Sequence, residues 1–343
     1  VMITGDNKET AVSIARDAGL LSGSPRELVL TGSELAEMSD AQLKDAIPSL
    51  RVVARALPTD KSRLVRLSQE LGLVVGMTGD GVNDTAALKR ADVGFAMGGG
   101  TEVAKDAGDI VILDNNFASI TKAILYGRTI FHSIRKFIVF QLTMNFCAVG
   151  VSLLGPFIGV DTPVTVMQML WINIIMDTLA GLAFAGEAPQ AAYMEEKPKS
   201  RREPIVTRDM IEQILITGGY TILLCTAFLR LPVFRTAFDF AGDFTGFMTA
   251  FFTLFVFCGI FNAFNARTHR INLLANLRKN KSFILVMLFV SAVQLLLIFF
   301  GGTMFRTHAL TFSAIREILL LAFTVIPFDL VRKILERLLT IRE

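Results

Sequence analysis

The stretch Thr78-Gly79-Asp80-Gly81-Val82-Asn83-Asp84 begins at the last residue of the apolar run Leu73 to Thr78. An apolar run that ends in glycine and aspartate is typical of a buried strand that leads into a loop. Ligands of open parallel sheets bind at the carboxyl ends of the strands, where glycines let backbone amides approach phosphate oxygens. The stretch therefore predicts a phosphate site, in which Asp80 and Asp84 offer the carboxylate oxygens that Mg2+ prefers.

Short apolar runs of this kind recur up to about residue 119 and alternate with helix-length segments such as Thr10 to Ala18 and Lys61 to Leu71. The predicted strands are Val1 to Thr4, Arg51 to Ala54, Leu73 to Thr78, Val93 to Met97 and Ile110 to Leu113. The alternation indicates a parallel sheet wrapped by helices, which is a doubly wound α/β fold.

From residue 137 onward the chain changes to long apolar stretches, and 52% of all residues are hydrophobic. A helix needs about 20 apolar residues to cross the hydrocarbon core of a bilayer. Six stretches are predicted to do so: about 137–158, 164–185, 211–229, 244–263, 282–301 and 314–330. We therefore expect a soluble α/β domain with a stalk at 1–128 and an all-α bundle of six transmembrane helices at 129–343.

The basic residues predict how these spans are oriented, because short cytoplasmic loops carry an excess of Lys and Arg. The loops after the second and fourth spans hold Lys197, Lys199, Arg201, Arg202, Arg208, Arg267, Arg270, Arg278, Lys279 and Lys281. The opposite loops hold only Arg230, Arg235 and Arg306. We therefore expect the α/β domain on the cytoplasmic side. Nucleic acid is not an expected partner, since the net charge is only +3 and the basic residues are scattered without interleaved aromatics.

Asp177 is a carboxylate inside the second predicted span, where an ionisable group is costly and usually functional. Asn173 lies four residues earlier and so shares its helix face. Asn145 in the first span offers a third oxygen, and Ca2+ takes about six to eight of them. These three residues predict a cation site, and a polar contact between helices is the alternative.

Other side chains within the spans are predicted to be structural. We expect interhelical hydrogen bonds from Gln141, Gln168 and Gln294. We expect small buried apolar side chains at Cys147, Cys225 and Cys258.

The stretch at 78–84 closely resembles the hinge signature of P-type ATPases, which are cation pumps. The resemblance extends to Met2-Ile3-Thr4-Gly5-Asp6-Asn7 and Ala54-Arg55-Ala56-Leu57-Pro58-Thr59-Asp60-Lys61, and it covers essentially the whole chain. Ala180 to Pro189 is most similar to calcium pumps of the plasma-membrane type. The resemblance implies a haloacid-dehalogenase-like (Rossmann-like) phosphorylation domain, in which an aspartate accepts the γ-phosphoryl group of ATP.

The same resemblance implies roles for individual residues. Thr4 would hydrogen-bond the phosphoryl oxygens, Lys61 would neutralise them, and Asp80 would hold Mg2+ with Asp84 nearby. Four residues would lie around the nucleotide phosphates: Gly5, Asp6, Arg55 and Asn83. In the membrane, Asn145, Asn173 and Asp177 would bind the transported Ca2+.

Two departures from the family pattern refine these expectations. The Asp-Lys-Thr-Gly-Thr segment that carries the phosphorylated aspartate does not occur in the sequence. We therefore expect the C-terminal part of a pump, inactive without its N-terminal part. Pumps that carry two calcium ions have a glutamate where this chain has Ala148, and the fourth span has Cys258-Gly259-Ile260 at the level of the expected ligands. One Ca2+ per ATP is therefore expected.

The absent segment would also be a strand. By resemblance, it lies between the strand ending at Thr4 and the strand ending at Thr78. These two strands are therefore expected either to flank an open slot or to pair directly with each other. Three alternatives stay open: a P-type pump for Na+, K+ or H+, a membrane-tethered phosphatase with its own nucleophilic aspartate, and a channel or scaffold without enzymatic activity.

Overall fold

The computed structural model describes residues 1–200, 203–238 and 244–340, without the side chains of 175–177 and 340. Contacts divide the chain into two compact units. The α/β unit comprises Val1–Leu125 and Met194–Glu203, and the helical unit comprises Tyr126–Tyr193 and Pro204–Glu343. The two units are described separately below.

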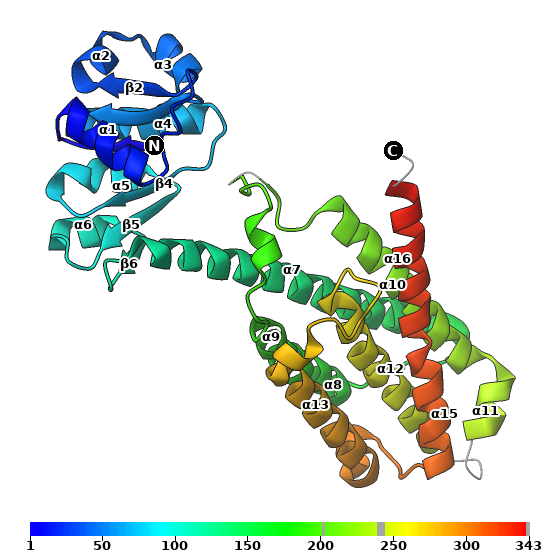
Figure 1. Cartoon of the computed structure of the whole chain (residues 1–343). Coiled ribbons are helices and arrows are strands. Elements are labelled where there is room, and N and C mark those ends of the chain that lie inside the picture. Colours follow the sequence, from blue (N-terminus) through cyan, green and yellow to red (C-terminus); the bar gives the residue numbers. More distant parts are fainter. Residues whose placement is uncertain (201–202, 239–243, 341–343) are drawn as a thin grey trace. The chain divides into compact units, whose positions relative to one another are not determined.

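Six parallel strands form the centre of the α/β unit (Figure 1). The first sheet has the order β1-β3-β2, and the second has the order β4-β5-β6. Their bounds are β1 (Met2–Ile3), β2 (Leu28–Thr31), β3 (Leu50–Ala54), β4 (Gly76–Gly79), β5 (Val93–Met97) and β6 (Ile110–Ile112). The parallel pairing is as predicted from the sequence. The prediction of a single sheet is wrong, because the strands form two sheets. β2 is not among the strands predicted from the sequence.

The first sheet is covered on both faces. Its helices are α1 (Lys8–Asp17), α2 (Gly32–Glu37), α3 (Asp40–Ala46) and α4 (Pro58–Glu70). Successive side chains of a strand point to opposite faces. Accordingly, Val53 packs with leucines of α2, α3 and α4, whereas Val52 packs with Ala11 and Ala15 of α1.

The second sheet shares α4 with the first. Its other elements are the 3-10 turn η1 (Val82–Asp84), α5 (Thr85–Arg90), α6 (Glu102–Ala107) and the start of α7 (Phe117–Leu154). Val65 of α4 packs beside Met77, whereas Leu64 and Leu67 of the same helix belong to the core of the first sheet. Strands β1 and β4 each lie at a sheet edge and do not pair with each other. Of the two arrangements expected for these strands, direct pairing is therefore not formed.

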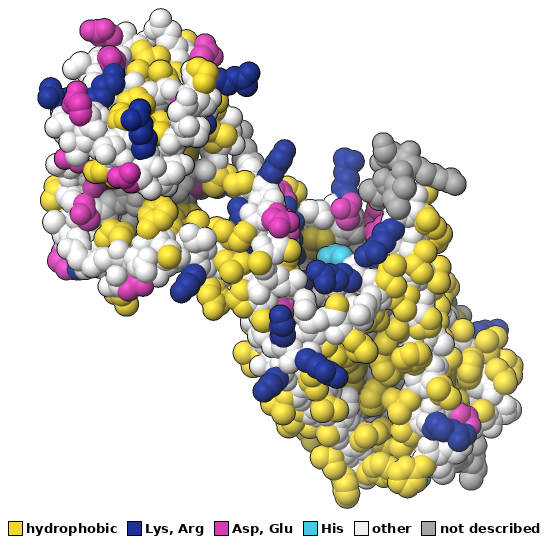
Figure 2. Space-filling view, viewed as in Figure 1, with side chains coloured by type: hydrophobic (Ala, Val, Ile, Leu, Met, Phe, Trp, Pro, Cys, Tyr) yellow, Lys and Arg dark blue, Asp and Glu magenta, His cyan; other side chains and the backbone are white. Residues whose placement is uncertain are grey.

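The helical unit is built around α12 (Phe244–Arg267), which packs against α10 (Arg208–Arg230), α13 (Lys281–Phe300), α15 (Phe312–Phe323) and α16 (Val325–Thr340). The remaining helical segments are η2 (Pro156–Ile158), α8 (Val166–Leu170), η3 (Trp171–Asp177), α9 (Thr178–Ala185), η4 (Ala191–Met194), α11 (Pro232–Phe238), η5 (Leu277–Lys279) and α14 (Gly302–Phe305). Figure 2 shows hydrophobic side chains over much of the visible face of this unit, with Lys and Arg gathered at one end.

Five helices in the described part of the chain are long and apolar enough to cross a membrane: Phe117–Leu154, Val166–Ala185, Arg208–Arg230, Phe244–Arg267 and Lys281–Phe300. The sixth predicted span is divided into α15 and α16 at Thr324. Pro327 explains the break, because it has no N–H to donate to the carbonyl of Phe323. The Thr324 hydroxyl instead donates to the Leu321 carbonyl, at 2.6 Å.

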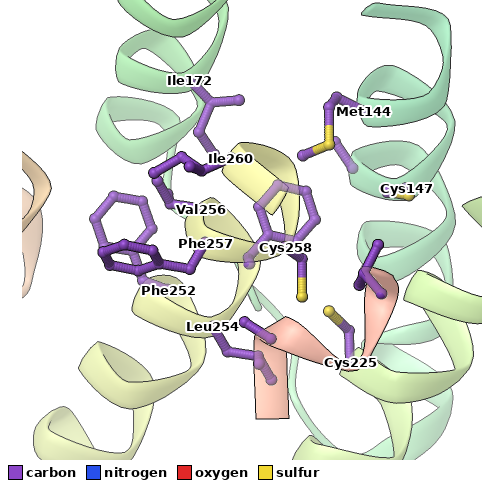
Figure 3. Packing of buried hydrophobic residues seen from close by; sticks show 14 of the residues in the cluster. Met144, Cys147, Ile172, Cys225, Phe252, Leu254, Val256, Phe257, Cys258 and Ile260 are labelled. Carbon is purple, nitrogen blue, oxygen red and sulfur yellow. The ribbon is translucent and has the colours of Figure 1, made fainter. Parts of the chain in front are cut away.

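The core of the helical unit contains the three cysteines, all unbonded to one another and at most 1% exposed. Figure 3 shows the sulfurs of Cys225 and Cys258 pointing toward each other among apolar side chains. Two of the predicted interhelical glutamine bonds are confirmed. The side-chain amide of Gln168 donates to the Phe305 carbonyl (2.8 Å), and that of Gln294 accepts from the Trp171 indole (3.2 Å).

Candidate functional site

The first part of the site lies where β1 and β3 end. Thr4 is tied to β3 through its backbone, since its N–H donates to the Val53 carbonyl and its own carbonyl accepts from Ala56. The Thr4 hydroxyl donates to the Asp6 carboxylate at 2.9 Å and accepts from the Asp6 N–H at 3.2 Å. Thr4 and Asp6 therefore form one compact loop, with Gly5 exposed between them.

Arg55 joins that loop to the end of β3. Its N–H donates to the Asp6 carbonyl at 2.9 Å, and its backbone is left-handed, with φ of 51°. This conformation is uncommon for a residue other than glycine and is often found at functional sites. The structure therefore brings Thr4, Asp6 and Arg55 together.

The second part of the site lies where β4 ends, and it is centred on Asp84. Lys61 of α4 donates to Asp84 Oδ1 at 2.6 Å, and the two side chains are only 15% and 8% exposed. Asp84 Oδ2 accepts from the N–H groups of Asp80 and Gly81, at 3.2 and 3.3 Å. One buried carboxylate thus holds both the lysine and the loop.

Gly79 is required at the last position of β4. A Cβ at this position would lie 2.4 Å from the Cβ of Asp84, so any side chain would displace the carboxylate from beneath the loop. Gly81, in the same stretch, meets nothing closer than 3.9 Å. The glycine of the Thr-Gly-Asp stretch therefore makes room for Asp84.

Asp80 and Asn83 have their side chains exposed at the end of β4. The Asp80 carbonyl accepts from Thr101 N–H at 2.8 Å, which fixes the backbone of the loop from the α6 side. Mg2+ prefers one or two carboxylates together with phosphate and water. An exposed Asp80 beside an Asp84 already bound to Lys61 fits such a site, with Asp80 as the carboxylate that faces solvent.

Two supporting residues escape the sequence analysis. Asp60, which is buried, lies one residue before Lys61, and it accepts from the Leu57 N–H at 2.8 Å and so caps the first turn of α4. Thr101 follows the turn Gly98-Gly99-Gly100, and this run of glycines is the signal that could have pointed to a loop beside the site.

Of the three residues predicted to form a cation site in the helical unit, the structure describes the side chains of two. Asn145 is half-buried on α7, Asn173 is exposed, and the side chain of Asp177 lies outside the described residues. No hydrogen bond joins Asn145 to Asn173. The described part of the chain also holds no group of three or more His, Cys, Asp or Glu side chains placed to bind a metal.

Asn173 and Asp177 lie on a π-helix, η3, rather than on the α-helix that the sequence analysis predicts. The hydrogen bonds of a π-helix span five residues instead of four, and such segments often mark functional sites. The local widening supports a special role for this segment.

Another carboxylate lies in the sixth predicted span. Asp329 is fully buried on α16, where Oδ1 contacts the Arg332 Nε at 2.7 Å and Oδ2 contacts the Lys333 Nζ at 2.9 Å. The sequence analysis also assigns Arg267 to a basic loop, and this is wrong. Arg267 ends α12 and is 1% exposed, because its guanidinium bonds to carbonyls inside the unit.

Comparison with known proteins gives two family matches. Residues 161–335, about half of the chain, match the family described as "Cation transporting ATPase, C-terminus". Residues 74–124 match the haloacid dehalogenase-like hydrolases. This chain belongs to the cation-transporting ATPase family. Together with the five apolar helices, that membership makes it a multi-pass membrane protein.

Relatives of this chain include proteins named as calcium-transporting ATPases. It is 39% identical to calcium-transporting ATPase PAT1 of Dictyostelium discoideum, over 90% of this chain and 31% of that protein. It is 35% identical to the plasma membrane-type calcium-transporting ATPase 9 of Arabidopsis thaliana, over 97% of this chain and 32% of that protein. It is 37% identical to calcium-transporting ATPase 2 of Schizosaccharomyces pombe, over 89% of this chain and 24% of that protein. The chain thus spans about a third of the length of these relatives or less.

Proposed function

We propose that this chain works as part of an ATP-driven calcium pump that forms an aspartyl-phosphate intermediate. The observation that carries the proposal is the buried Lys61–Asp84 pair beneath a loop with an exposed Asp80, in a chain whose relatives are named calcium-transporting ATPases. Phosphoryl transfer depends mostly on positioning and charge neutralisation, and this arrangement offers both.

In the α/β unit, Lys61 would neutralise the transferred phosphoryl group and the Thr4 hydroxyl would hydrogen-bond it. Asp80 would hold Mg2+ with Asp84 nearby, and bound Mg2+ would supply further charge neutralisation. The nucleotide phosphates would lie near Gly5, Asp6, Arg55 and Asn83. The phosphorylated aspartate would come from a segment that these 343 residues do not include, so the chain alone is not expected to hydrolyse ATP.

In the helical unit, Asp177, Asn173 and Asn145 would bind the transported Ca2+. The π-helix at Trp171–Asp177 supports a special role for this segment. With Ala148 in place of a carboxylate, we propose one Ca2+ per ATP, with further ligands supplied by other parts of the pump.

In the bilayer, α15 and α16 would together form a sixth span, interrupted at Thr324. The two basic loops would lie on the cytoplasmic side, and so would the α/β unit. This orientation follows from the distribution of Lys and Arg between the loops.

The experiment is Asp177→Asn in the full-length pump. We expect loss of calcium-dependent phosphorylation by ATP and retention of phosphorylation by inorganic phosphate, because the Mg2+ site does not involve Asp177. Asp161→Asn, an exposed carboxylate in the loop before α8, is the matched control and should behave as the wild type. Counting of occluded radioactive calcium in the wild type should give one ion per phosphorylation site.

Unaltered calcium affinity in Asp177→Asn would remove Asp177 from the cation site. Phosphorylation of the wild type that responds to another cation and not to Ca2+ would indicate a pump of different specificity. Two occluded ions per phosphorylation site would show that other residues replace the carboxylate missing at Ala148.

A further inference from the structure

The helical unit places one buried carboxylate between two buried cations. The side chains of Glu187, which follows α9, Lys136 on α7, and Arg267 at the end of α12 are 5%, 8% and 1% exposed. Lys136 Nζ donates to Glu187 Oε2 in a short ion pair. Arg267 Nη1 lies 3.7 Å from Glu187 Oε1. Each carboxylate oxygen therefore faces a different cation.

The two cations are held differently. Arg267 is fixed, because its Nη2 donates to the carbonyls of Leu273 (2.6 Å) and Ala275 (2.7 Å), and its guanidinium lies 5.6 Å from the centre of the Phe283 ring. Lys136 has Glu187 as its one hydrogen-bond partner among the residues that the structure describes. Release from Glu187 would therefore free Lys136 but would leave Arg267 in place.

Glu187 is attached to the same group of helices as Arg267. The Asn280 side chain donates to the Ala183 carbonyl at 3.0 Å, which joins the end of α9 to the start of α13. Gly186 lies against Ser282, since a Cβ at Gly186 would be 2.9 Å from the Ser282 Cβ. The end of α9 is thus bonded to the start of α13, and Phe283 of α13 lies beneath the Arg267 guanidinium of α12. The ion pair with Lys136 connects α7 to these helices.

Lys136 lies on a helix that continues into the other unit. Helix α7 runs without interruption from Phe117 to Leu154 and passes the unit boundary at residues 125 and 126. Any displacement of α7 along or about its axis would therefore reach Lys136.

Exchange of partners at Glu187 is energetically feasible. Removal of the partner of a buried charge is usually strongly destabilising, because it leaves that charge uncompensated. Here Arg267 stays beside the carboxylate, so Glu187 keeps a cation when Lys136 leaves. The long stem of a lysine lets its ammonium reach water from a partly buried position.

We propose that Glu187 is a two-partner latch: its carboxylate holds Lys136 in the conformation described here and passes to Arg267 when α7 moves during the transport cycle. The proposal rests on the proposed pump function. It makes Glu187, Lys136 and Arg267 positioning residues that act on the balance between two conformations of the pump.

The test uses Lys136→Met and Arg267→Lys in the full-length pump. Lys136→Met opens the latch, whereas Arg267→Lys weakens the competing partner and keeps the latch closed. The apparent affinity for Ca2+ should therefore shift in one direction in Lys136→Met and in the other direction in Arg267→Lys, and the same holds for the apparent affinity for inorganic phosphate. Each shift should be about 5-fold or more. Arg316→Met, which removes a cation that is 72% exposed, is the control and should shift neither affinity.

Shifts in the same direction, or unchanged affinities in a Lys136→Met pump that still phosphorylates, would overturn the latch. Hydrogen–deuterium exchange on the same proteins needs no catalysis and separates this result from a failure of the proposed function. Exchange at 186–193 should rise in Lys136→Met and not in Arg267→Lys, and equal exchange in both would also contradict the proposal. A wild type without calcium-dependent phosphorylation would instead refute the pump function.

Discussion

The two units each bury a carboxylate that is paired with a lysine, but they use it differently. Asp84 in the α/β unit bonds to Lys61 and to two backbone N–H groups of its own loop. Glu187 in the helical unit lies between two cations from other helices. Asp84 is therefore part of a fixed local geometry, as a phosphate site requires. Glu187 connects separate helices and can exchange one partner for the other.

The largest expected effect concerns the fixed site. Lys61→Met in the full-length pump removes both the partner of Asp84 and the charge proposed to neutralise the phosphoryl group. Loss of one such electrostatic contact typically lowers a rate by about 10²–10³-fold. We expect a decrease of that size in the single-turnover rate of phosphorylation by ATP.

The control for Lys61→Met is Lys105→Met, since Lys105 forms a surface pair with Glu102, which is 83% exposed. That variant should phosphorylate at the wild-type rate. A Lys61→Met rate within twofold of the wild type would show that Lys61 holds the loop and takes no part in the chemistry.

The second prediction concerns Asp329, a buried carboxylate of the helical unit. We expect its ion pairs to stabilise the fold without an exchange of partners. Asp329→Asn leaves Lys333 without a carboxylate partner and Arg332 with only the half-exposed Glu336. Loss of the partner of a buried charge typically costs about 3–5 kcal/mol. Lys333 keeps its bonds to the carbonyls of Asn265 and Thr268, so we expect the lower end of that range. Thermal unfolding of the full-length pump in detergent measures it.

Glu336→Gln is the matched control for Asp329→Asn, because Glu336 also pairs with Arg332 but is 46% exposed. Its unfolding temperature should stay close to that of the wild type. If Asp329→Asn unfolds at the wild-type temperature and loses calcium transport, Asp329 belongs to the transport pathway. Its ion pairs would then not be purely structural, and Asp329 would no longer differ from Glu187 in this respect.

Local patterns predict the elements that surround the proposed phosphate site. The strand predicted to end at Thr78 follows from an apolar run closed by glycine and aspartate, and the helix carrying Lys61 follows from the length of the segment between two predicted strands. The pairing of Lys61 with Asp84 joins residues far apart in sequence, and the resemblance to P-type ATPases brought them to one site. The division into two sheets was not predictable in this way, because it depends on which strands lie side by side.

The cluster around Glu187 could not be predicted from the sequence for a related reason. In the sequence, Glu187 is noted only within the stretch Ala180 to Pro189 that is similar to calcium pumps, and Arg267 is counted as one more cation of a basic loop. Only the meeting of α7, α9 and α12 buries these charges. The π-helix at Trp171–Asp177 likewise gives no periodic signal that separates it from an α-helix.

The smallest effect is expected for an exposed pair in the α/β unit. Asp40 accepts from Arg66 at 2.6 Å and from Arg63 at 2.9 Å, and these hydrogen bonds hold the pKa of Asp40 below its usual value. Arg63 also donates to the carbonyls of Leu35 and Met38, so the cluster ties α4 to the end of α2. Surface pairs contribute little to stability, because water screens their charges.

A lowered carboxyl pKa fixes the sign of the pH dependence. The stabilisation from Asp40 is present above the ordinary pKa of an aspartate, about 3.9, and is lost as the pH falls through the lower pKa of the folded protein. Asp40→Asn should therefore raise hydrogen exchange in residues 32–70 slightly at pH 7, and the difference from the wild type should vanish in acid. Glu102→Gln is the control and should leave this segment unchanged at both pH values. A difference that persists in acid would mean that Asp40 does not act through its charge on Arg66 and Arg63.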